Sequence, residues 1–130
     1  METRSLEQLE KDIWKEPSEF PSDLVEKCHR YRKISIAELT NEQIRLLISQ
    51  QIGMEHLIGT VLARLQLNVL SEGDYYEGDL LVATSKLPIE FWKENQTAYR
   101  TFKGIVDKNS ELIKAQLGEK EFNKLINKIV

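Results

Sequence analysis

The chain of 130 residues has few of the residues that reactive or disulfide-stabilised proteins depend on. It contains one cysteine, Cys28, so no disulfide can form within the chain, and only two histidines. No segment approaches the roughly 18 uninterrupted apolar residues of a membrane-spanning helix. Residues 1–15 carry acids every few positions and no apolar run, so we expect no signal peptide and a cytoplasmic protein.

An excess of basic residues is also missing, since the formal net charge is −3. Proteins that bind DNA or RNA directly usually carry a strong basic excess, because neutralising phosphates supplies much of their affinity. Residues 1–92 hold 16 acidic and 10 basic side chains, whereas residues 93–130 hold 5 and 8. The acidic part of the chain favours a basic protein partner over nucleic acid.

Signals for β-strands are weak, whereas signals for helix starts are frequent. Capping boxes occur at Ser5–Gln8, Ser35–Glu38 and Thr40–Gln43, where a hydroxyl and a side chain three residues later satisfy free backbone amides. The box at Ser5 predicts a helix to about Trp14, with Ile13 on its apolar stripe. The box at Ser35 predicts a single turn at 36–39. Other helices are predicted after Ser22, after Thr40, over about Met54–Leu67, after a cap at Asp79, at Pro88, over about Gln96–Asp107, to Leu117, and after Gly118.

The segment at 54–67 has a nearly continuous apolar flank and is predicted to be the central, most buried helix. Gly59 inside it costs roughly 1 kcal/mol of helix propensity relative to alanine, which we expect close packing by a neighbouring helix to offset. With 41% apolar and 30% charged residues, the chain is expected to fold as one domain, 1–130. The predicted fold is all-α, a compact helical bundle of about seven to nine short helices.

The cysteine and the histidines do not form a recognisable catalytic or metal-binding pattern. Cys28 and His29 are neighbours on a helix, so their side chains diverge by ~100° and are not expected to act as nucleophile and base. His56 lies on a later helix, and no His, Cys or carboxylate set has the spacing of a metal site. We therefore expect no catalytic residue, no cofactor and no metal.

The segment Ser71–Asp79 contains two glycines, four carboxylates and two adjacent tyrosines, and is predicted to be a loop. It fails the pattern of a calcium-binding EF-hand loop, because the required glycine position falls on Asp79. Tyrosine supplies a large contact area at low entropic cost and is enriched at interface hot spots. The alternatives are that the tyrosines fold back onto the core, or that the carboxylates hold a divalent ion. The candidate contact residues are Glu72, Asp74, Tyr75, Tyr76, Glu77 and Asp79.

Several segments occur together in an order typical of one bacterial family. They are Leu6–Glu10 with Asp12–Trp14, Leu24–Val25 with Cys28–His29, Leu39 to Gly53, Glu72–Leu81, and Leu87–Pro88 with Phe91–Trp92. Over residues 5–92 the chain resembles the immunity proteins of contact-dependent growth inhibition (CDI) systems. It departs from that family at Gly59–Thr60, where a proline-containing pair is expected, and residues 93–130 carry no recognised motif.

The resemblance implies a specific function. Immunity proteins of this kind bind the C-terminal toxin domain of a CDI effector in the cytoplasm of the producing cell and so protect that cell from its siblings. The toxins are often nucleases, especially RNases, which need basic substrate sites. Residues 37–92 hold 8 acids and 3 bases, which agrees with a basic partner. Two alternatives are a non-enzymatic regulatory or adaptor module of another bacterial complex, and a small carboxylate-dependent metal-binding enzyme. The toxin's identity and the oligomeric state stay open.

Overall fold

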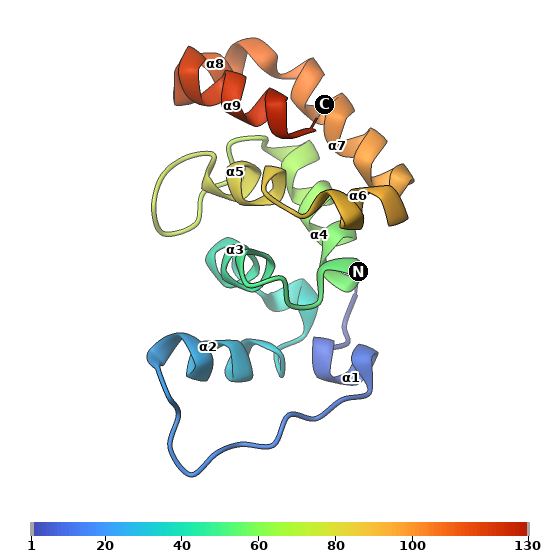
Figure 1. Cartoon of the computed structure of the whole chain (residues 1–130), viewed down its shortest axis with the longest axis vertical. Helices are drawn as coiled ribbons and strands as arrows, with labels where there is room; N and C mark the ends of the chain where they lie inside the picture. The colour runs from blue at the N-terminus through green and yellow to red at the C-terminus, as the bar shows by residue number, and fades with distance from the viewer. Residues whose placement is uncertain (1, 130) are drawn as a thin grey trace.

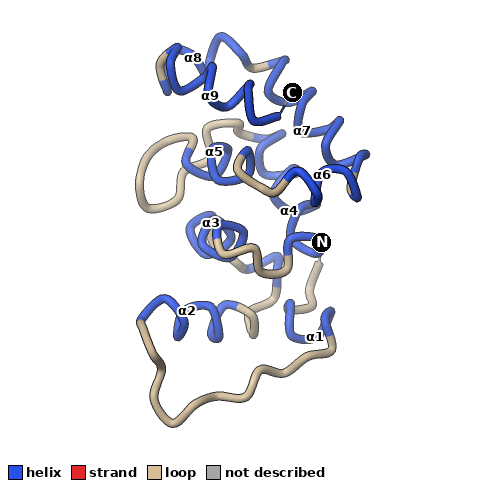
Figure 2. Tube along the Cα trace, in the orientation of Figure 1, coloured by secondary structure: helices blue, strands red, loops and turns tan. Residues whose placement is uncertain are grey.

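The computed structural model describes residues 2–129, so the two end residues of the predicted domain lie outside the described part. Within it the chain forms nine α-helices, one short 3₁₀ turn and no strand, and the all-α prediction is confirmed (Figures 1 and 2). The elements are α1 (Leu6–Glu10), α2 (Asp23–Tyr31), the turn η1 (Ile36–Glu38), α3 (Asn41–Ser49), α4 (Met54–Leu67), α5 (Asp79–Ser85), α6 (Ile89–Glu94), α7 (Gln96–Lys108), α8 (Ser110–Leu117) and α9 (Glu119–Ile129).

Two of the three predicted capping boxes form. At α1 the Ser5 hydroxyl accepts from the Gln8 amide at 3.2 Å, and the Gln8 side chain accepts from the Ser5 amide at 2.9 Å. Thr40 and Gln43 make the same pair of bonds at the start of α3. Ser35 makes no side-chain cap and instead forms an isolated β-bridge with Ser5, so the second box is wrong although the single turn it predicted is present.

The first helix is shorter than predicted. The helix ends at Glu10 and does not continue to Trp14, because Lys11 takes a left-handed conformation with φ of 53°. Ile13 is therefore 74% exposed and does not lie on a buried apolar stripe.

The buried guanidinium of Arg32 explains this early end. Its Nη2 donates to Glu10 Oε1 and to the carbonyl of Asp12, each at 2.8 Å. The guanidinium carbon also lies 4.0 Å from the ring centroid of Trp14, which is half-buried. A buried charge needs such partners. If the helix continued past Glu10, it would not place Asp12 and Trp14 around the guanidinium.

The core is one connected apolar cluster that centres on α4. This helix contacts η1, α3 and α7, while α5 lies between α3 and α9. As predicted, α4 buries its apolar flank, which consists of Leu57, Ile58, Val61, Leu62 and Leu65. The close packing expected at Gly59 is absent, because a Cβ built there would meet no atom within 4 Å.

The helices are stacked along the long axis of the molecule, with α1 and α2 at one end and α8 and α9 at the other (Figure 1). The loop between α4 and α5 projects from one side of the stack, while α6 and α7 lie on the other side. Among the described residues, no helix has both the length and the apolar character needed to cross a bilayer.

Candidate protein-binding loop

Residues 72–78, here called the acidic loop, form the last part of the connection between α4, which ends at Leu67, and α5, which starts at Asp79. An isolated bridge between Glu72 and Glu77 closes the loop at its base. The Gly78 amide donates to the Leu70 carbonyl at 3.1 Å, and Gly78 has φ of 97°, a conformation that glycine adopts without strain. The two ends of the loop therefore lie next to each other, where the loop joins the helices.

Asp79 holds the loop from inside. Its Oδ1 accepts from the Gly73 amide at 2.6 Å, and its Oδ2 accepts from the amides of Tyr75 at 3.1 Å and Tyr76 at 3.5 Å. Asp79 is only 4% exposed. The prediction that Asp79 caps α5 is wrong, because Gly78 occupies the cap position and the carboxylate binds amides of the preceding loop.

A second carboxylate, on α3, holds the loop from the outside. Glu42 Oε1 accepts from the Asp74 amide at 3.0 Å and from Arg45 Nε at 2.7 Å, and Oε2 accepts from Arg45 Nη2 at 2.6 Å. The hydrogen-bonded Arg45 guanidinium lowers the pKa of Glu42 below its usual value, against the opposing effect of burial. The side chain of Asn41 adds a bond to the Glu72 carbonyl at 3.3 Å.

Gly73 lies where these two carboxylates approach the backbone. A Cβ at this position would lie 2.6 Å from Glu42 Oε1 and 3.0 Å from Asp79 Oδ2. Both distances are shorter than carbon and oxygen atoms tolerate in ordinary contact. Glycine at residue 73 therefore allows both carboxylates to bind the loop at once.

The two tyrosines face outward. Tyr75 is 68% and Tyr76 is 44% exposed, so neither is folded away in the core. The guanidinium carbon of Arg45 lies 4.6 Å from the Tyr75 ring centroid, a cation–π arrangement that covers one face of the ring. Partial burial, together with the nearby Asp79 carboxylate, raises the pKa of Tyr76.

Three other carboxylates, on Glu72, Asp74 and Glu77, are exposed at the loop surface. None of them forms an ion pair with any residue of the described part of the chain. The acidic loop is thus a negatively charged projection with two exposed aromatic rings, supported by Asp79 and by the Glu42–Arg45 pair.

A model of the family described as CDI immunity proteins matches residues 8–101. The chain belongs to the CDI immunity protein family. The match contains the acidic loop, α3 and Asp79, which confirms the resemblance seen in the sequence. No curated protein and no solved structure matches this immunity protein.

The loop carboxylates of the immunity protein do not converge on one point. Within residues 2–129, the one group of three side chains that brings possible metal ligands together is Glu10, Glu55 and His56, whose ligand atoms lie within 4.8 Å of one another. Sequence spacing missed this group because the contact between the end of α1 and the start of α4 is tertiary. Glu10 is already used there, since its Oε1 neutralises Arg32.

Cys28 and His29 of the immunity protein are directed to different surroundings. Cys28 is buried, and this burial raises the pKa of its thiol, which disfavours the nucleophilic thiolate. The ring of His29 instead makes edge contacts with Trp14 at 5.1 Å and Phe20 at 5.0 Å between centroids. These contacts pack the segment between α1 and α2 against the body.

Proposed function

We propose that this immunity protein neutralises the toxin domain of a CDI effector by presenting the acidic loop to a basic surface of that domain. The observation that supports the proposal most strongly is the exposure of Tyr75 on a loop that two structural carboxylates hold in place. Large exposed aromatic side chains on a fixed support are typical of interface anchors.

Charge supports the same partner. A nuclease, and an RNase in particular, needs a basic site to hold phosphate groups, and we propose a toxin of this class. Glu72, Asp74 and Glu77 place three unpaired carboxylates around the two tyrosines, where they attract such a site and speed the encounter. In the proposed complex these carboxylates occupy the phosphate positions and exclude the nucleic acid.

The hydrogen bonds that hold the loop in place are expected to lower the cost of binding. A flexible loop loses conformational entropy when it is ordered at an interface, at about 0.5–1.5 kcal/mol for each immobilised side chain. Here the amides of Gly73, Asp74, Tyr75 and Tyr76 are already bound to Asp79 or Glu42. We therefore assign Asp79 the role of a positioning residue, while Glu72, Asp74, Tyr75, Tyr76 and Glu77 are the proposed contacts.

The proposed action is stoichiometric and not catalytic, and it takes place in the cytoplasm of the producing cell. The immunity protein binds the toxin one to one and leaves it chemically unchanged. This mode needs no cofactor and no metal.

The test uses the toxin domain encoded beside the immunity gene. The wild type, a Tyr75→Ala/Tyr76→Ala variant and a Tyr31→Phe control are each titrated into an RNA-cleavage assay. We expect the double variant to need at least a tenfold higher concentration for half-inhibition, because it loses both aromatic anchors. Inhibition by the double variant at the wild-type concentration, with an unchanged circular dichroism spectrum, would contradict the role of the loop.

A further inference from the structure

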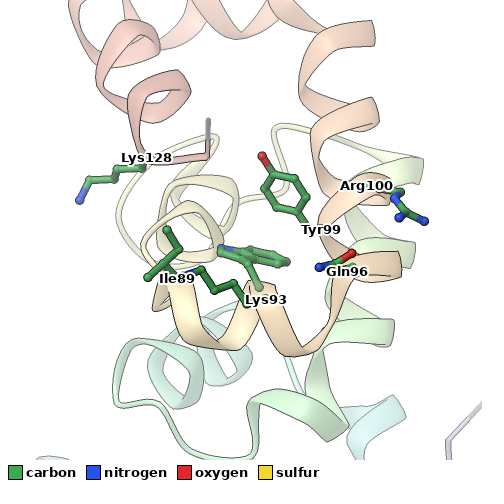
Figure 3. Close-up of a pocket in the computed structure, with 7 residues that line it drawn as sticks. Ile89, Lys93, Gln96, Tyr99, Arg100 and Lys128 are labelled. Carbon is green, nitrogen blue, oxygen red and sulfur yellow. The ribbon is translucent and has the colours of Figure 1, made fainter.

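A second surface feature lies away from the acidic loop, where α6, α7 and the end of α9 meet (Figure 3). It is a pocket with a volume of about 370 Å³, within the range of small-molecule sites. Its lining residues come from three helices and are Ile89, Trp92, Lys93, Gln96, Tyr99, Arg100 and Lys128.

Aromatic rings form one wall of this pocket, and the packing beneath holds them in position. The Trp92 ring stacks on Phe102 with 5.4 Å between centroids and an interplanar angle of 17°. Tyr99 meets Trp92 edge-on at 6.0 Å. Ile89, which is 57% exposed, adds an apolar surface at the mouth of the pocket. Trp92 is only 4% exposed, so little of its ring is open to a ligand, and Tyr99 and the exposed Ile89 provide the other apolar surface of this wall.

The positive charge of the pocket favours an anionic ligand. Its lining contains three cations, Lys93, Arg100 and Lys128, and no carboxylate. None of the three forms an ion pair within residues 2–129, and all three are exposed. Figure 3 shows Lys128 and Arg100 on opposite flanks with their charged ends turned outward. Both side chains are exposed, so we expect an anion in the pocket to attract their charged ends inward and to reduce their mutual repulsion.

The indole of Trp92 adds a polar group to the apolar wall. Its Nε1 is buried and has no hydrogen-bond acceptor among the described residues. Buried donors normally have a partner, so this N–H is unusual, but an acceptor on a ligand would reach it only if the surrounding side chains moved.

From these features we propose that the pocket binds a small aromatic carboxylate. The ring of this ligand lies against Tyr99, Ile89 and the small accessible part of Trp92, and its carboxylate is held by the lysine and arginine side chains. None of the residues that line the pocket belongs to the acidic loop, so we expect this ligand to leave the loop uncovered.

The test follows the indole N–H resonances of Trp92 and Trp14 in ¹⁵N-labelled protein, assigned with a Trp14→Phe variant. The probes are 2-naphthoate, its neutral amide 2-naphthamide, and acetate. We expect 2-naphthoate to shift the Trp92 resonance in a saturable way and to leave the Trp14 resonance in place. The neutral amide and acetate are expected to bind at least tenfold more weakly, because each lacks either the charge or the ring.

Two charge-matched variants separate the pocket from general electrostatics. In the first variant all three pocket cations are replaced, as Lys93→Gln/Arg100→Gln/Lys128→Gln. We expect it to bind 2-naphthoate with at least tenfold lower affinity than the wild type. Lys103→Gln/Lys108→Gln/Lys120→Gln removes three exposed cations that do not line this pocket and is expected to bind as the wild type does. Any of three results would overturn the proposal. They are equal affinities for 2-naphthoate and 2-naphthamide, equal losses of affinity in the two triple variants, and no shift of the Trp92 resonance.

Discussion

At the scale of single residues, Asp79 shows how a charged group becomes structural. Its carboxylate is buried, yet three loop amides donate to it, and this replaces the water it gives up. If the carboxylate is removed, those three amides lose their hydrogen-bond acceptor. The shape of the acidic loop therefore depends on one side chain that is not itself exposed.

Asp79→Asn tests this dependence. We expect the free energy of unfolding to fall by about 1–3 kcal/mol, because an amide side chain replaces one of the two acceptor oxygens. Hydrogen exchange at the amides of Gly73, Tyr75 and Tyr76 is expected to become faster. Unchanged exchange at all three amides would contradict the assignment of Asp79 as the support of the loop.

Two glycine substitutions form a matched pair. Gly73→Ala places a methyl group against Glu42 and Asp79, so we expect a loss of about 1–3 kcal/mol and weaker toxin binding. Gly59→Ala meets no atom and lies inside α4, so it is expected to stabilise the protein by about 0.5–1 kcal/mol. Thermal unfolding of both variants checks this, and a Gly73→Ala variant as stable as the wild type would be inconsistent with the geometry.

At the scale of elements, α3 and the acidic loop are joined by the Glu42–Arg45 pair and by the bond from Glu42 to the Asp74 amide. Because the folded protein lowers the pKa of Glu42, the unfolded chain binds a proton here more readily than the folded one. The contribution of Glu42 to stability is therefore fully present above its unfolded pKa of about 4.3. It is lost as the pH falls from there through the lower folded pKa.

Urea unfolding of the wild type and of Glu42→Gln between about pH 7 and pH 3 measures this contribution. At neutral pH the variant is expected to be less stable by about 1–3 kcal/mol, since it lacks the charge-assisted bonds to Arg45. The difference between the two proteins is expected to shrink below about pH 4, because the unfolded wild-type chain takes up a proton at Glu42 there while the folded protein still resists it. A constant difference across the whole range would rule out the proposed linkage.

The elements that could be predicted from the sequence are those that local chemistry determines. The boxes at Ser5 and Thr40, the cap at Ser22 and the apolar flank of α4 act within one or two turns, and the structure contains all of them. The early end of α1, by contrast, has a long-range cause. Arg32 ends α1 early by a contact across 22 residues of sequence.

The same distinction applies to the candidate site. The composition of residues 71–79 indicated a loop with exposed charge, but it did not show which of four carboxylates faces inward. That choice depends on how α5 packs against α3 and α9, which places Asp79 beneath the loop. Glu42 also had no signal in the sequence, because its bond to Asp74 spans 32 residues.

At the scale of the whole molecule, the helices past the family match help to position the loop. The match ends at residue 101, whereas α8 and α9 pack onto each other and α9 contacts α5. A Cβ at Gly78, at the base of the loop, would lie 3.3 Å from Leu117 of α8. The C-terminal helices thus complete the support of a loop that lies within the matched region.

The acidic loop and the α6–α7–α9 pocket carry charges of opposite sign. The acidic loop projects from one side of the helical stack (Figure 1), whereas the pocket cations Arg100 and Lys128 lie on two opposite flanks of the pocket (Figure 3). For the basic toxin proposed above, we expect attraction to the acidic loop and repulsion from the pocket cations.

The central claim, that unpaired loop carboxylates bind a cationic toxin, is tested most directly by measuring toxin affinity against salt concentration. Calorimetry between about 50 and 500 mM salt compares the wild type, Glu72→Gln/Asp74→Asn/Glu77→Gln, and the charge-matched control Glu90→Gln/Glu94→Gln/Asp107→Asn. We expect the loop variant to bind at least tenfold more weakly at low salt and to show a flatter salt dependence, while the control follows the wild type. Wild type and loop variant with the same affinity and the same salt dependence would contradict the account.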